Sequence, residues 1–236
     1  VLVLAPTREL ALQVSQNFEI FSKYLENKPK IITLIGGESI SEQLLNIQKG
    51  CDIVVATTGR LIDIIDKKQL DLSSLEFFVL DEADKMLDLG FEEELEKVLQ
   101  IIPNSRQNLL FSATYEKKVE NIASKITQKA IFISIEEKPI VQNITQRAIS
   151  VNKENRSALL RELISKNSWK KILVFMANKR SCDNIAFKFR KNNLSAVSFH
   201  SDLTQEERNE TLNEFKENKI KILFATDIMA RGIHID

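Results

Sequence analysis

Short apolar runs and amphipathic segments alternate along the whole first half of the chain. Runs rich in β-branched and aromatic residues predict strands at 1–4, 31–35, 53–56, 77–80, 108–111 and 130–135. Apolar residues at helical spacing predict one buried helix face formed by Leu10, Val14, Phe18, Phe21 and Leu25. Further helices are expected at 85–89, at 91–102 and after Tyr115. This alternation is typical of an α/β fold with parallel sheets.

The second half repeats the pattern. We expect helices at 156–165, 179–190 and 205–216, and strands at 171–176, 196–200 and 220–225. Between the halves, the charged segment 136–143, which contains Pro139, predicts a linker. Because 236 residues form two domains more naturally than one, we place the domains at 1–138 and 139–236.

Three acids directly follow the apolar run 77–80. A continuous apolar run predicts a strand buried on both faces, and ligands of open α/β sheets bind outside the carboxyl ends of such strands. Asp81 is therefore placed to hold Mg²⁺ through water, and Glu82 to orient or deprotonate an attacking water. Alternatively, these acids and Asp84 only favour the N-terminus of the following helix.

Other predicted strands of the first half also end in polar or glycine-containing sequences. They are Pro6-Thr7-Arg8, Gly36-Gly37, Thr57-Thr58-Gly59-Arg60 and Ser112-Ala113-Thr114. The first offers a guanidinium and a hydroxyl beside a helix N-terminus, where a phosphate can bind. The glycine pair suits either a tight turn or a close approach of the backbone to a ligand. Ser112 and Thr114 could hydrogen-bond Asp84 or cap the next helix.

The second half carries comparable sequences at its strand ends. Leu173 to Asn178 includes Phe175, which in an apolar strand is more often a core residue. His200-Ser201-Asp202 precedes Gln205 and Arg208, and Thr204 to Glu207 also forms a capping box. The strand 220–225 runs into a segment that contains Thr226, Arg231, Gly232 and His234.

In this order the sequences resemble motifs Ia to V of the DEAD-box RNA helicases, with Asp81-Glu82-Ala83-Asp84 as the signature tetrad. The resemblance implies two tandem RecA-like parallel-sheet lobes, each incomplete in this chain. It departs from the family pattern at Thr58, Ser201 and His234, where the family usually has Pro, Gly and Asp. No GxxxxGK[ST] phosphate loop and no arginine-rich last motif occur in the chain, so we interpret it as an internal fragment.

The resemblance also implies roles for individual residues. Asp81 and Glu82 would be catalytic, Asp84, Ser112 and Thr114 would couple the sites, and Gly232 and His234 would bind nucleotide. RNA would contact Pro6, Thr7, Arg8, Gly36, Gly37, Thr57, Gly59, Arg60, Gln205, Arg208 and Thr226.

The implied function is ATP-dependent unwinding of RNA or remodelling of RNA–protein complexes, with ATP and Mg²⁺ as cofactors. Single-stranded RNA and short duplexes would be bound with little dependence on sequence, since the contacts go to phosphate and sugar. The parent protein would be the active enzyme, and the 236-residue chain alone is expected to be inactive. A catalytically inactive RNA-binding relative and a metal-dependent hydrolase are the alternatives.

Charge, hydrophobicity and cysteine content indicate which ligands and which cellular compartment to expect. Residues 1–140 hold 16 Lys+Arg against 22 Asp+Glu, and residues 141–236 hold 17 Lys+Arg against 11 Asp+Glu. The second half is therefore basic. This charge suits phosphate binding, or it only reflects lysine-rich helix surfaces in solvent. No apolar run approaches the ~18 residues of a membrane span. Two distant cysteines and two histidines allow no zinc site and favour a reduced, cytoplasmic compartment.

Overall fold

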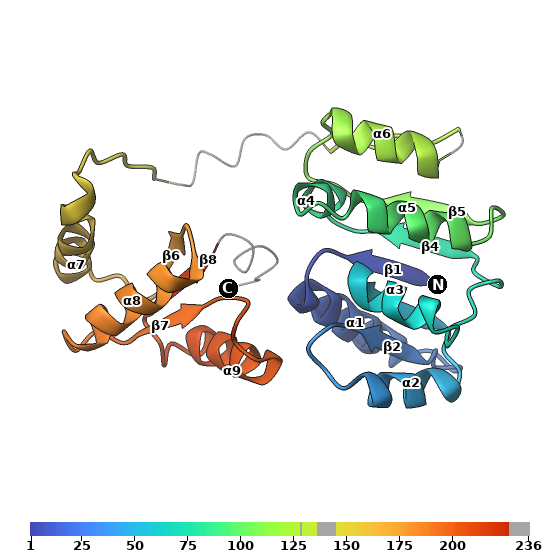
Figure 1. Ribbon diagram of the computed structural model, residues 1–236, viewed down its shortest axis with the longest axis horizontal. Coiled ribbons are helices and arrows are strands. Elements are labelled where there is room, and N and C mark those ends of the chain that lie inside the picture. The colour runs from blue at the N-terminus through green and yellow to red at the C-terminus, as the bar shows by residue number, and fades with distance from the viewer. Residues whose placement is uncertain (128, 136–144, 227–236) are drawn as a thin grey trace. The chain divides into compact units, whose positions relative to one another are not determined.

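The structure is a computed structural model that describes residues 1–127, 129–135 and 145–226 (Figure 1). The described residues separate into two compact units, the first ending before Lys129 and the second beginning there. The predicted linker 136–143 lies outside the described residues. The domain boundary at 138 and 139 therefore stays a prediction.

The first unit is built on a parallel sheet of five strands in the order β2-β3-β1-β4-β5. In chain order the strands are β1 (Leu2–Ala5), β2 (Ile31–Leu34), β3 (Ile53–Thr57), β4 (Phe77–Leu80) and β5 (Gln107–Leu110). β1 lies at the centre, where Val3 pairs in register with Val55 on one side and Val79 on the other. Because all five strands are parallel, their carboxyl ends meet at one edge of the sheet.

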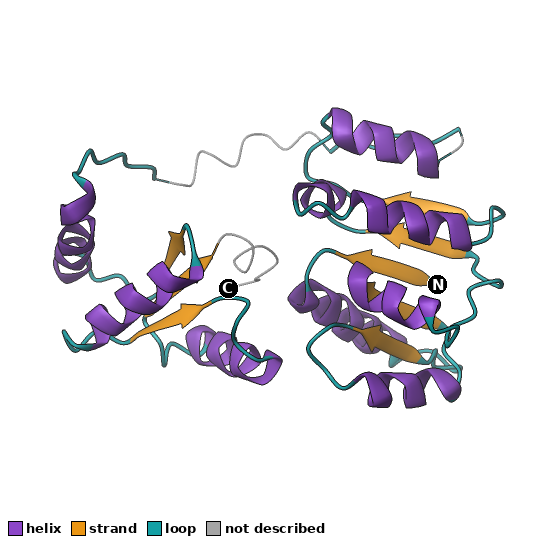
Figure 2. Cartoon of the chain, viewed as in Figure 1, coloured by secondary structure: helices purple, strands orange, loops and turns teal. Residues whose placement is uncertain are grey.

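Helices cover the two faces of this sheet unequally (Figures 1 and 2). They are α1 (Arg8–Ser22), α2 (Ile40–Gln48), α3 (Thr58–Asp66), α4 (Ala83–Asp88), α5 (Glu92–Ile101) and α6 (Lys117–Ile126). The larger core packs Phe78 and Leu80 of β4 against side chains of α3, α5 and α6. The smaller core lies on the opposite face, where Leu10 and Ala11 of α1 pack against β1 and β3.

This unequal cover corrects two predictions. Phe77 is 38% exposed and Val79 is only partly buried, so β4 is not buried on both faces, because α1 packs mainly on β1, β2 and β3. The buried helix face predicted for α1 was also too long at its C-terminal end. That helix ends at Ser22, and both Phe21 and Leu25 are exposed.

The predicted strand 130–135 was wrong. These residues form no strand, and Ile131, Ile133 and Ile135 are each more than four-fifths exposed. An apolar run becomes a strand only when a neighbouring strand supplies its hydrogen bonds. Within the described residues, β5 is the outermost strand of the sheet and no strand pairs with segment 130–135.

The second unit contains a parallel sheet of three strands in the order β6-β8-β7. Its elements are α7 (Arg156–Lys166), β6 (Ile172–Met176), α8 (Lys179–Arg190), β7 (Ala196–Phe199), α9 (Gln205–Lys216) and β8 (Ile222–Thr226). α7 and α8 cover one face, where the rings of Phe189 and Phe224 meet edge to face at 5.1 Å. α9 contacts β7 and buries Phe215.

Phe175 of β6 is 61% exposed, although a core position was expected. β6 is an edge strand of the described sheet, and α9 packs on β7 rather than on β6. Among the described residues, no helix is long and apolar enough to cross a membrane.

Candidate nucleotide and RNA site

The acidic tetrad begins where β4 leaves the sheet. The backbone N–H of Asp81 still donates to the Leu4 carbonyl at 3.0 Å, so the chain turns only at the next residue. Glu82 adopts a left-handed conformation (φ 49°, ψ 51°), which is uncommon for a residue with a side chain. Such local strain often occurs at functional sites. Here it redirects the chain into α4 and leaves both carboxylates at the sheet edge.

The two carboxylates have different surroundings. Partial burial raises the pKa of Asp81, and the nearby Glu82 carboxylate adds to this, whereas the Glu82 backbone N–H, 2.9 Å from Oδ1, opposes the rise. Glu82 Oε1 forms an ion pair with Lys85, and its buried Oε2 has no hydrogen-bond partner in the described part of the chain. A bound cation would stabilise the ionised form of Asp81, and a water could satisfy Glu82 Oε2.

Asp84 joins the tetrad to the loop after β5. Its Oδ2 accepts hydrogen bonds from the Thr114 backbone N–H at 3.2 Å and the Thr114 hydroxyl at 3.1 Å. Its backbone N–H donates to Ser112 Oγ at 3.3 Å, and Ser112 Oγ donates to the Thr114 carbonyl at 2.6 Å. Neither hydroxyl caps the next helix, because the N-cap of α6 is Glu116. The structure thus brings together all three residues assigned to coupling, and the role itself stays a prediction.

Arg8 lies over the glycine pair that follows β2. A Cβ built on Gly37 would sit 2.2 Å from Arg8 Nη1, and one built on Gly36 would sit 3.1 Å from Arg8 Nη2. Gly37 also has a φ of +82°, a conformation that suits glycine. The glycines therefore form a turn and also leave space for the guanidinium. Thr7 caps α1, with its Oγ1 accepting from the Leu10 N–H at 3.2 Å, and Pro6 is buried beside it.

The sequence after β3 contributes a second arginine to the same edge. Arg60 Nη2 donates to the Glu38 carbonyl at 3.2 Å, and its buried Nη1 has no hydrogen-bond partner among the described residues. Thr57 Oγ1 donates to the Leu34 carbonyl at 3.5 Å, a distance that marks a weak bond. Gly59 is exposed, and a Cβ at this position would meet no atom of the described residues within 4 Å.

Thr58, where the helicase family has Pro, is the first residue of α3. Its side chain is 1% exposed, and its hydroxyl has no hydrogen-bond partner in the described residues. The first helical position suits proline, because that N–H has no partner within the helix. Thr57 before it already has the extended conformation that proline requires of its predecessor (φ −86°, ψ 144°).

Thr58→Pro is therefore expected to stabilise the first unit by about 0.5–1 kcal/mol, which raises its Tm by about 2–4 °C. The variant restricts the unfolded chain and removes a buried hydroxyl that lacks a partner. Thr58→Val replaces only the hydroxyl, by a methyl group of similar size, and separates the two contributions. Thermal unfolding followed by circular dichroism checks this, and a lower Tm for Thr58→Pro would contradict it.

In the second unit, the residues predicted to contact RNA lie in α9 and at the end of β8. Gln205 and Arg208 are buried, hydrogen-bond each other, and are 6% and 3% exposed. Thr204 and Glu207 form the expected capping box at the start of α9. Thr226 ends β8. The RNA-binding role of these residues stays a prediction, and Gly232 and His234 lie outside the described residues.

Two residues of these sites were missed by the sequence analysis. Lys85 pairs with Glu82, and its spacing of three residues within a helical turn could have indicated the contact. Asp183 of α8 binds the Ser198 hydroxyl at 2.7 Å and His200 Nε2 at 3.0 Å. These two bonds, from Ser198 first and His200 second, lower the pKa of Asp183. No sequence pattern marks that contact, since it joins α8 to β7.

The first unit belongs to the class of open parallel α/β proteins. Its polar sequences lie at the carboxyl ends of the strands, where proteins of this class bind ligands. The chain belongs to the DEAD/DEAH box helicase family, whose model matches residues 1–122. A second model, the helicase conserved C-terminal domain, matches residues 154–236.

Individual relatives agree with this assignment. The probable ATP-dependent RNA helicase ddx3 of Dictyostelium discoideum is 38% identical, with 99% of this chain and 33% of that protein covered. The ATP-dependent RNA helicase RhlB of Pseudomonas aeruginosa is 36% identical, with 100% of this chain and 60% of that protein covered. The chain thus spans a third to three-fifths of these relatives.

Among solved structures, S. cerevisiae Dbp5 bound to RNA and ADP BeF3 is similar to this chain. It gives a TM-score of 0.82 at 27% identity, with 99% of this chain and 59% of that chain covered.

Proposed function

We propose that the full-length protein is an ATP-dependent RNA helicase, which couples ATP hydrolysis to RNA binding and to local unwinding or remodelling of RNA–protein complexes. One observation carries the proposal. Five parallel strands of the first unit deliver carboxylates, hydroxyls and two arginines to a single sheet edge. The family assignment and the names of the relatives support the same activity.

The carboxylates supply the chemistry at this edge. Asp81 would hold Mg²⁺ through water, and the ion would neutralise charge on the ATP phosphates. Glu82 orients and deprotonates the attacking water through Oε2, because Lys85 already occupies Oε1. Asp84, Ser112 and Thr114 link the loop after β5 to the tetrad, so a change at the nucleotide can reach the RNA surface.

RNA contacts in the first unit would be to phosphate and sugar. Arg8 and Arg60 follow neighbouring parallel strands, and each presents a guanidinium at the same edge. Guanidinium contacts to phosphate carry no sequence information, so binding of single strands and short duplexes is expected to be sequence-tolerant and to weaken steeply with salt.

The test measures ATP hydrolysis and strand separation by the full-length protein, with and without RNA. We expect RNA to stimulate hydrolysis, and a short duplex to be separated only with ATP. Ser112→Ala combined with Thr114→Ala is expected to reduce strand separation more than hydrolysis. RNA binding without ATP turnover would instead identify an inactive RNA-binding relative.

The metal-dependent hydrolase has less support. Among the described residues, no group of three His, Cys, Asp or Glu side chains is placed to hold a metal ion. A single carboxylate that contacts Mg²⁺ through water needs no such group, because ATP phosphates supply the other oxygens.

The cysteines support a cytoplasmic location. Cys51 and Cys182 are both free, and Cys182 is buried, with its pKa raised to about 11 mainly by that burial. Free thiols of this kind are typical of reducing compartments. A fluorescently tagged full-length protein found in a secretory compartment would contradict this location.

A further inference from the structure

The second unit contains a pocket of about 550 Å³ that the proposed function does not use. It lies between the C-terminal end of α7 and the segments that lead into the three strands. We call it the Trp169 pocket, and its lining includes Ile164, Asn167, Trp169, Lys170, Leu194 and Lys221. Pockets of a few hundred Å³ suit a small ligand or the side chains of a short peptide.

The position of the Trp169 pocket separates it from the helicase motifs. Lys170 lies just before β6, Leu194 just before β7, and Lys221 directly before β8, so the pocket sits at the amino ends of all three parallel strands. Thr226 and His200 lie at the carboxyl ends. Strands of this length, at about 3.3 Å per residue, put roughly 15 Å between the two edges. A ligand in the pocket therefore leaves the carboxyl edge free.

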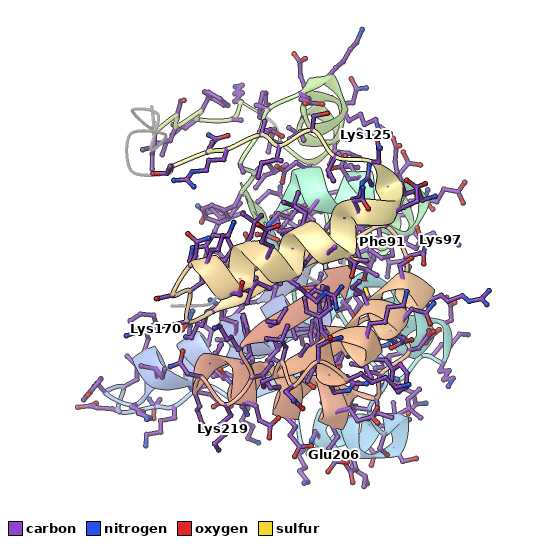
Figure 3. The ribbon with its side chains drawn as sticks, turned by 90° about the vertical axis from the view of Figure 1, so that its left-hand side faces the viewer. Phe91, Lys97, Lys125, Lys170, Glu206 and Lys219 are labelled. Carbon is purple, nitrogen blue, oxygen red and sulfur yellow. The ribbon has the colours of Figure 1, made fainter. Side chains whose placement is uncertain are left out.

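The lining combines apolar side chains with two lysines. Trp169 is 42% exposed, while Ile164, which also lines the pocket, is 3% exposed. Figure 3 labels Lys170 near the C-terminal end of α7. Lys166 and Lys219 nearby form ion pairs with Glu162 and Glu217. In the part of the chain that the structure describes, Lys170 and Lys221 form no such pair.

We propose that the Trp169 pocket binds an acidic linear peptide of a protein partner, with one apolar or aromatic side chain against Trp169 and Leu194. Flanking carboxylates of the peptide would pair with Lys170 and Lys221, which line the pocket and form no ion pair with another described residue. The basic charge of residues 141–236 favours an acidic partner. An RNA strand is the competing occupant, but the residues assigned to RNA contact lie at the other edge of the sheet.

The test uses the full 236-residue chain, in which Trp169 is the only tryptophan, so its fluorescence reports directly on the pocket. The probe is a short synthetic peptide with one central phenylalanine flanked by aspartates and glutamates. We expect saturable quenching or a spectral shift of Trp169. A peptide with lysines in place of the acids, and one with alanine in place of the phenylalanine, are each expected to bind at least about tenfold more weakly.

Charge reversal locates the binding. Lys170→Glu with Lys221→Glu is expected to weaken peptide binding at least about tenfold, whereas Lys188→Glu with Lys216→Glu, an equal charge change on exposed sites outside the pocket, is expected to leave it unchanged. Circular dichroism checks folding, and Lys170→Glu alone is the variant to use if the double variant unfolds. Its expected effect is a weakening of several-fold.

Three outcomes would overturn the proposal. They are no peptide binding, equal binding of the acidic and basic peptides, and displacement of the acidic peptide by a short single-stranded oligouridylate that itself changes Trp169 fluorescence. The last would assign the pocket to RNA. None of these outcomes depends on ATP hydrolysis, so the proposed helicase function is tested separately.

Discussion

Glu82→Gln is expected to lower RNA-stimulated ATP hydrolysis by the full-length protein about 100-fold or more, with RNA binding nearly unchanged. The amide keeps the shape of the carboxylate but cannot take a proton from water. Glu82 Oε2 is buried and has no hydrogen-bond partner within the described residues, which leaves it available to a water. Lys85 holds only the other oxygen.

The backbone at this position makes glutamine the right substitution. Glu82 has a φ of 49°, and glutamine bears the same cost of this conformation as glutamate, so the fold at the tetrad is kept. The lost ion pair with Lys85 is partly exposed and is worth at most about 1 kcal/mol. Steady-state phosphate release in the presence of RNA is the measurement.

Glu93→Gln is the matched control, because Glu93 is an exposed glutamate on α5 of the same unit and lies outside the tetrad. It is expected to retain the wild-type rate. If Glu82→Gln retained activity within a few-fold of wild type while binding RNA normally, Glu82 could not be the base.

The first unit illustrates what the sequence could predict. Apolar runs such as Val1 to Leu4 and Ile53 to Ala56 have neighbouring strands on both sides, so their predicted strands match the structure to within a residue. The run 130–135 has a similar apolar pattern, but in the described residues no neighbouring strand pairs with it. A strand depends on a partner that its own sequence does not contain.

Local patterns predicted the members of the candidate site but not their contacts. The spacing of Asp84 from Ser112 and Thr114 says nothing of distance, and their expected contact relied on parallel strands ending at one edge. The position of Arg8 over Gly37 could not be predicted, because it depends on the conformation of the turn after β2. Helices α2 and α3 were also missed, since each is short and follows a glycine- or threonine-rich turn.

The position of Arg8 over Gly37 leads to the second large expected effect. We expect Gly37→Ala to lower RNA affinity about tenfold or more. The added Cβ would lie 2.2 Å from Arg8 Nη1 and 2.9 Å from Arg8 Cζ, so the guanidinium must leave its place at the sheet edge. Losing one phosphate contact is also expected to reduce the salt dependence of RNA binding by about one unit of slope. Titration of single-stranded RNA at several salt concentrations measures both quantities.

Gly50→Ala is the control that separates this displacement from backbone strain. Gly50 has a φ of +81°, nearly the same as Gly37, but among the described residues a Cβ there would meet only Lys30 Nζ, at 4.0 Å. Alanine in this conformation costs roughly 1–2 kcal/mol of stability at either position. We therefore expect comparable losses of Tm in the two variants but weakened RNA binding in Gly37→Ala alone. Equal RNA affinities would show that Arg8 does not contact RNA from its position over the glycine turn.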